Sequence, residues 1–83
     1  MTQDYCAIQV NGEGQSVPAG TTLRDIVQHV VGRELRTDGT PSDDSRLAVA
    51  AAVSGSVVPR GRWHDTVVPE GAEIDVVTAA QGG

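Results

Sequence analysis

The first apolar residues of the chain alternate with polar ones. Cys6, Ile8 and Val10 fall on one face of residues 5–10, and this period of two is typical of a half-buried strand. Asn11-Gly12 follows directly, and this dipeptide favours a tight hairpin because both central turn positions need a positive φ. We therefore predict a hairpin with a short return strand, residues 15–17, that ends before Pro18.

After this hairpin the apolar spacing becomes helical. The residues that share one face are Leu23, Ile26, Val27, Val30 and Val31. Thr22 is the expected N-cap, Asp25 completes a weak capping box, and Gly32 is a natural end. Because β-branched residues lower helix propensity, we expect this helix to depend on packing against a sheet.

Residues 33–46 differ in character from the rest of the chain. Their central part, residues 37–45, contains no apolar residue. Nothing in it suggests catalysis, so we interpret residues 33–46 as a flexible polar loop.

The apolar pattern resumes in three further predicted strands, residues 47–53, 56–58 and 73–78. For residues 47–53 the alanines also allow a helix. A short irregular or 3₁₀ stretch is expected at residues 60–65. The resulting order, ββαβββ, predicts an α+β fold: a mixed sheet with one main helix, in which the last strand runs centrally beside the first. That arrangement is the ubiquitin-like β-grasp. A ferredoxin-like fold would need a second helix, which only the polar residues 33–46 could supply. We expect one domain over residues 1–78 and a mobile tail over residues 79–83.

Composition narrows the function. The 83 residues carry 6 basic and 11 acidic side chains, a net charge of −5, with no lysine and only Tyr5 and Trp63 as aromatics. Nucleic-acid binding needs clustered cations and stacking rings, so we expect none, and an acidic surface favours a basic partner protein. The single cysteine, Cys6, allows no internal disulfide. No secretion signal or membrane span is evident, so we expect a cytoplasmic protein that is monomeric when alone.

Five blocks of the sequence resemble the ThiS family of sulfur-carrier proteins from thiamine biosynthesis. They are Ile8-Gln9-Val10-Asn11-Gly12, Ala19-Gly20-Thr21-Thr22-Leu23, Val57-Val58-Pro59-Arg60 with Trp63, Gly71-Ala72-Glu73-Ile74-Asp75-Val76-Val77, and Gln81-Gly82-Gly83. The diglycine is shared with other carriers, whereas its combination with the Val-Pro-Arg-x-x-Trp block is more specific. Family members usually pass from helix to third strand by a shorter connection than residues 33–46.

The resemblance implies a carrier without an active site or bound cofactor of its own. A ubiquitin-activating-type enzyme would adenylate the Gly83 carboxylate with ATP and magnesium. Sulfur from a donor such as a cysteine desulfurase would then displace AMP and leave a thiocarboxylate. Thiazole synthase would receive this sulfur. Gly82 and Gln81 would pass through the enzymes' narrow channels, which suits glycine because it has no Cβ.

Other residues are candidates for contact with these partners. The outward face of residues 47–53 is apolar, and with Val77 it could form a docking strip: Ala48, Ala50 and Ala52. Arg60 could contribute a salt bridge to a partner. Trp63 is expected to be either a core residue or an interface anchor. His29 and His64 lack ligand partners at metal spacing, so no metal site is predicted.

Four alternative functions remain compatible with the sequence. The chain could be the small subunit of molybdopterin synthase, although the Val-Pro-Arg-x-x-Trp block disfavours this, or a related carrier for another pathway. It could also be a ubiquitin-like modifier joined to target lysines through Gly83. A plain interaction module with incidental glycines is the fourth reading.

Overall fold

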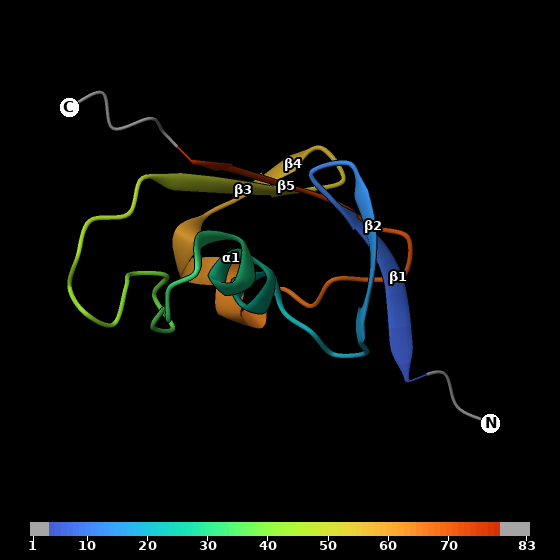
Figure 1. The fold of residues 1–83 in the computed structure, drawn as a ribbon, viewed down its shortest axis with the longest axis horizontal. Helices are drawn as coiled ribbons and strands as arrows, with labels where there is room; N and C mark the ends of the chain where they lie inside the picture. Colours follow the sequence, from blue (N-terminus) through green and yellow to red (C-terminus); the bar gives the residue numbers. More distant parts are fainter. Residues whose placement is uncertain (1–3, 79–83) are drawn as a thin grey trace.

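The computed structural model describes residues 4–78, and over these residues it shows a five-stranded mixed sheet in the order β2-β1-β5-β3-β4. The helix α1 and the 3₁₀ helix η1 lie on one side of this sheet (Figure 1). The β-grasp prediction is therefore confirmed. In chain order the elements are β1 (Tyr5–Val10), β2 (Glu13–Pro18), α1 (Leu23–Val31), β3 (Val49–Val53), β4 (Ser56–Val58), η1 (Arg60–Asp65) and β5 (Glu73–Thr78).

The first hairpin forms as its sequence predicts. Asn11 and Gly12 have φ values of 51° and 85°, so both central turn positions are left-handed. The return strand is longer than residues 15–17, because pairing starts directly beyond the turn at Val10↔Glu13. The Asn11 side chain adds a second function, since its Oδ1 accepts a hydrogen bond of 2.9 Å from the Val76 N–H and ties the turn to β5.

The helix has both predicted ends. The Thr22 hydroxyl accepts from the Asp25 N–H, and the Asp25 carboxylate accepts from the Thr22 N–H at 3.1 Å, which completes the capping box. Gly32 closes the helix with φ 71°. Of the predicted apolar stripe, three residues are fully buried: Leu23, Ile26 and Val27. The prediction was wrong for Val30, which is exposed because grooves open on both sides of this end of the helix.

The last strand occupies the centre of the sheet, as predicted. β5 runs parallel to β1 on one side and antiparallel to β3 on the other. Its inward residues, Ile74 and Val76, are buried in the core, while its acidic residues face outward. β5 ends at Thr78, which pairs with Val49 at the beginning of β3. The end of β5 and the start of β3 therefore share one end of the sheet.

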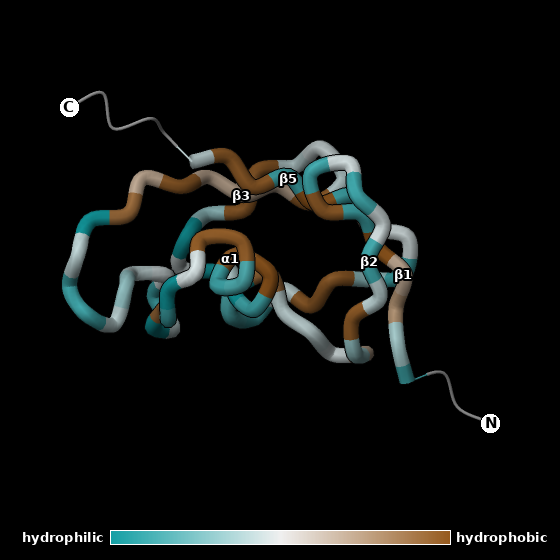
Figure 2. The backbone as a smooth tube through the Cα atoms, in the orientation of Figure 1, coloured by the Kyte–Doolittle hydropathy of each residue, from teal (hydrophilic) through white to brown (hydrophobic). Residues whose placement is uncertain are grey.

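Residues 33–46 make contacts that their polar composition did not predict. Leu35 is buried in the core, and it forms a backbone bridge with Pro41. The Arg36 guanidinium donates to the Ser42 carbonyl and to the Asp44 carboxylate. In Figure 2 this segment is mostly teal or white, whereas β3 beyond it is brown or pale. The segment thus has a polar exterior, and the buried Leu35 side chain holds it against the domain. Its flexibility stays a prediction.

Gly39 lies against Arg60, the first residue of η1. Its φ is 85°, and a Cβ built on it would lie 2.8 Å from the Arg60 carbonyl oxygen and closer still to the Arg60 side chain. Arg60 in turn donates to the carbonyl oxygens of Leu47 at 2.6 Å and Val49 at 3.3 Å. β4 pairs with β3 only as far as Ala51, so it does not extend to the start of β3. There the Arg60 guanidinium donates the hydrogen bonds that a longer β4 would supply.

We expect Gly39→Ala to lower the free energy of unfolding by about 1 to 3 kcal/mol, since it combines a strained φ with a steric clash. Chemical denaturation would measure the loss. Gly55→Ala is the matched control, because Gly55 also has a positive φ, 87°, but open space where the Cβ would be. If the two variants lost equal stability, backbone strain alone would explain the effect and the contact with Arg60 would not matter.

Candidate functional site

The residues predicted to carry the chemistry, Gln81, Gly82 and Gly83, lie outside the described residues. The structure does describe the end of the sheet from which that segment continues. There β5 ends at Thr78, beside the first residue of β3. The residues around this point form the surface that a partner protein would contact when it binds the C-terminal tail (residues 79–83).

An apolar surface lies next to this point on the face of the sheet opposite α1. Ala50 pairs directly with Val77, so their side chains stand side by side, and Val77 is 63 % exposed. Ala48 is exposed as well, whereas Ala52 is half-buried. A shallow depression of about 360 Å³ lies on this surface. Its lining consists of Ala48, Ala50 and Val77, together with Val49 and Arg60. The structure thus places the predicted docking residues of β3 and β5 together.

One member of this surface was not predicted from the sequence. Val57 on β4 pairs directly with Ala52 and is 75 % exposed. The alternation Ser56-Val57-Val58 could have indicated it, because Val57 and Val58 must face opposite sides of a strand. We call the surface the apolar strip and define it as Ala48, Ala50, Ala52, Val57 and Val77.

Trp63 does not belong to the apolar strip. Its side chain is only 1 % exposed, and its indole Nε1–H donates to the Val58 carbonyl oxygen at 3.0 Å. The hypothesis of a partner-facing tryptophan is therefore corrected: the ring fills the core between α1 and the sheet, where η1 places it. Arg60 stacks on this ring at 5.4 Å from its centroid. Its hydrogen bonds to β3 make it a structural residue at the border of the strip.

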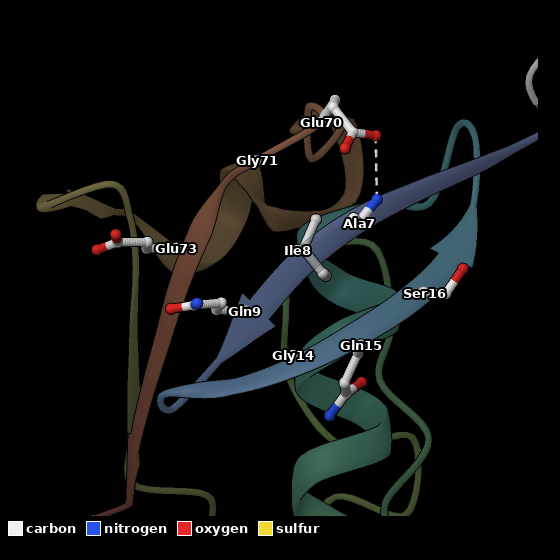
Figure 3. Close-up of a pocket in the computed structure, with 9 residues that line it drawn as sticks. All are labelled: Ala7, Ile8, Gln9, Gly14, Gln15, Ser16, Glu70, Gly71 and Glu73. Carbon is white, nitrogen blue, oxygen red and sulfur yellow. Dashed lines mark hydrogen bonds between the residues drawn. The ribbon is translucent and has the colours of Figure 1, made fainter.

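Acidic residues lie beyond the apolar strip along β5. Asp75 pairs with Ala52, and Glu73 pairs with Gln9 of β1. Next to them is a groove of about 520 Å³ between β1, β2 and the segment that leads into β5 (Figure 3). The Glu70 carboxylate above it accepts a hydrogen bond of 3.0 Å from the Ala7 N–H, so it completes the ladder of β1. Glu70 therefore has a structural role at this groove, which Glu73 lines as well.

The described residues also bear on a metal site, a reactive cysteine and a membrane-spanning helix. Within residues 4–78 no group of three or more His, Cys, Asp or Glu side chains could hold a metal ion. Cys6 is half-buried and packs against the core. No helix among these residues is long and apolar enough to span a membrane.

Comparison with known proteins gives a family. A search of curated proteins found no match. The model of the ThiS family, by contrast, matches residues 4–83, which is nearly the whole chain. Proteins of this family are sulfur carriers and not enzymes, and they bind no cofactor. With this match and a β-grasp sheet whose central strand leads toward the C-terminal tail, the chain belongs to the ThiS family.

Proposed function

We propose that this sulfur carrier supplies the sulfur of the thiazole ring in thiamine biosynthesis and that it carries that sulfur as a thiocarboxylate on Gly83. The observation that supports this most is the family match, which extends through the diglycine at residues 82–83. The Val58-Pro59-Arg60 block with Trp63 adds to it, because these residues form the β4–η1 corner that supports the apolar strip.

The chemistry needs a partner that the family implies, an activating enzyme. That enzyme uses ATP and magnesium, and the Gly83 carboxylate attacks the α-phosphorus with loss of pyrophosphate. Sulfide then attacks the acyl-adenylate, so that the C–S bond forms as AMP leaves. Where a cysteine desulfurase is the donor, its persulfide displaces AMP to give an acyl disulfide, and a thiol reductant supplies the two electrons that cleave this disulfide to the thiocarboxylate. The carrier contributes its carboxylate and its ability to enter a narrow channel, which two residues without Cβ atoms provide.

Partner recognition also needs a surface outside the tail. The apolar strip lies beside Thr78, so an enzyme that encloses the tail would cover it at the same time. The exposed valines of β4 and β5, with the alanines of β3 between them, are well suited to such an interface, because their burial removes apolar surface from water. The same strip would serve the activating enzyme and thiazole synthase in turn.

Val77→Asp is therefore expected to weaken binding to the activating enzyme by about tenfold or more, since it would bury a charge in an apolar interface. Titration calorimetry measures this. Val67→Asp is the control, because Val67 is similarly exposed, at 55 %, but lies in the segment that pairs with Thr22, outside the strip. Equal affinities for the two variants would contradict the docking role of the strip.

The pathway is tested by transfer of the sulfur. Carrier that has been converted to the thiocarboxylate would be mixed with thiazole synthase and its other substrates, and the intact mass would be followed. We expect the carrier to return to its carboxylate form as thiazole product appears. If sulfur stayed on the carrier with thiazole synthase but left it with the large subunit of molybdopterin synthase, the thiamine assignment would be wrong.

A further inference from the structure

A cleft of about 370 Å³ lies between the end of α1 and the start of β3. Val30 and Val31 form its helical wall, and Leu47, Ala48, Val49 and Thr78 belong to the opposite side. Two arginines line it as well: Arg33 and Arg46. Thr78 is the last residue of β5, so this cleft opens where the chain continues into residues 79–83. In Figure 1 this is the end of the sheet at which the 33–46 segment joins β3.

The two guanidinium groups are available to an anion. The Arg33 guanidinium donates to the Ser45 hydroxyl at 2.9 Å and to the Arg46 carbonyl at 2.8 Å, and both acceptors are neutral. Among residues 4–78, the ion pairs are Arg36–Asp44 and Arg62–Asp65, so neither cleft arginine has a carboxylate partner there. Both side chains are exposed. Hydrogen bonds from Ser45 and, to a lesser degree, the nearby Arg33 guanidinium hold the pKa of Asp43 below its ordinary value, so Arg33 is partly compensated. Arg46 has no such neighbour among the ion pairs of residues 4–78, and in a chain with 11 acidic residues a cleft lined by two arginines is a local exception.

The cleft is continuous with the apolar strip. Ala48 and Val49 line both the cleft and the depression on the strip, so an enzyme seated on the strip would extend over the two arginines. Covering a guanidinium group with protein removes it from water, and this costs a large free energy unless an opposite charge is supplied. A carboxylate satisfies that need best, because its two oxygens match the guanidinium fork.

We propose that Arg33 and Arg46 form a docking site for carboxylate side chains at the channel mouth of the activating enzyme. The inference rests on the proposed function, since it takes the tail to be enclosed by that enzyme. Together with Glu73 and Asp75 further along the same face, the cleft gives the docking surface a direction: positive beside the tail, apolar in the middle and negative beyond. Such charge complementarity fixes the register of a partner and raises its association rate.

Arg46→Glu tests this site with little risk to the fold, because the Arg33 hydrogen bond goes to the backbone carbonyl of residue 46 and not to its side chain. We expect Arg46→Glu to weaken binding of the full chain to the activating enzyme by about tenfold. Arg46→Gln should weaken it less and should make the affinity less sensitive to salt. Titration calorimetry at several salt concentrations would measure all three proteins.

Arg62→Glu is the matched control. It changes the net charge by the same amount, but Arg62 is paired with Asp65 on η1 and does not line the cleft. We expect its affinity to stay within about twofold of the unmodified chain, because a surface ion pair contributes little. If Arg46→Glu bound as well as Arg62→Glu, the proposed site would be overturned. Tighter binding of Arg46→Glu would also overturn it, and would indicate that the cleft holds the chain's own Gly83 carboxylate.

A parallel assay separates this inference from the proposed function. Thiocarboxylate formation on the unmodified chain is followed by intact mass under the same conditions. If the unmodified chain is thiocarboxylated but Arg46→Glu does not change the affinity, the proposed function stands and the proposed arginine site is wrong. If the unmodified chain is never thiocarboxylated, the proposed function is wrong, and the role of the two arginines in binding the enzyme is wrong with it.

Discussion

Gly82→Ala is expected to lower the rate of thiocarboxylate formation by about 100-fold, because a displacement of about 1 Å at a reacting group can have that effect. The added methyl group would meet the wall of a channel built for glycine, so the Gly83 carboxylate would stop short of the ATP α-phosphorus. The rate is measured by intact mass spectrometry after incubation with the activating enzyme, ATP, magnesium and sulfide.

We expect the stability of this variant to be unchanged, because the core cluster of the described domain is formed by residues between Cys6 and Val76. Thermal unfolding of both proteins provides this control. Ala80→Gly is a second control, since it changes the same tail without adding a side chain. A Gly82→Ala protein that was activated at the normal rate would contradict the channel model for residue 82.

Trp63→Ala is expected to have the largest effect on the fold, with a loss of about 3 to 5 kcal/mol. Trp63 is the largest fully buried side chain in the described residues, and it packs among the core residues of α1 and the sheet. Native proteins have total stabilities of about 5 to 15 kcal/mol, so the loss is a large fraction of the total, and the urea midpoint of this variant should fall steeply. Urea denaturation followed by circular dichroism would show it.

Trp63→Phe distinguishes packing from hydrogen bonding at the same position. It keeps most of the apolar volume but removes the Nε1–H donor to the Val58 carbonyl, and we expect a smaller loss of about 1 to 3 kcal/mol. This folded variant should still be thiocarboxylated. Normal stability with weakened enzyme binding would contradict the core assignment and return Trp63 to the interface.

The fold could be predicted where local pattern decides the structure. Asn11-Gly12 determines a hairpin because of its backbone conformation, and Thr22 with Asp25 determines a helix start through hydrogen bonds within four residues. The central position of β5 followed from the need for neighbours on both sides. All of these depend on residues close in sequence or on a general rule of sheet topology.

Contacts between distant residues were not predictable in the same way. Gly39 against Arg60, and Arg60 against the carbonyls of β3, join segments that no sequence period connects. Leu35 was assigned to a polar loop because one apolar residue gives no period, and yet it is buried. A lone tryptophan in a small domain favoured a core position, but its size also suits an interface, so the sequence left both readings open.

The same distinction between local pattern and long-range contact applies to the candidate site. The apolar strip was predictable from the parity of Ala48, Ala50 and Ala52, and the pairing of Ala50 with Val77 places two of its strands side by side. The cleft of Arg33 and Arg46 was not, because it needs the end of α1 and the start of β3 to meet. Gly82 and Gly83 remain a prediction from the sequence.

We propose, above all, that Gly83 is the residue on which this carrier holds its sulfur. The most direct test of this proposal is the intact mass of the full chain after incubation with the activating enzyme, ATP, magnesium and sulfide. The proposal predicts the mass gain of one sulfur in place of one oxygen, located by fragmentation at Gly83 and absent without ATP. An unchanged mass with an enzyme that activates another carrier normally would contradict it, as would a gain located at Cys6.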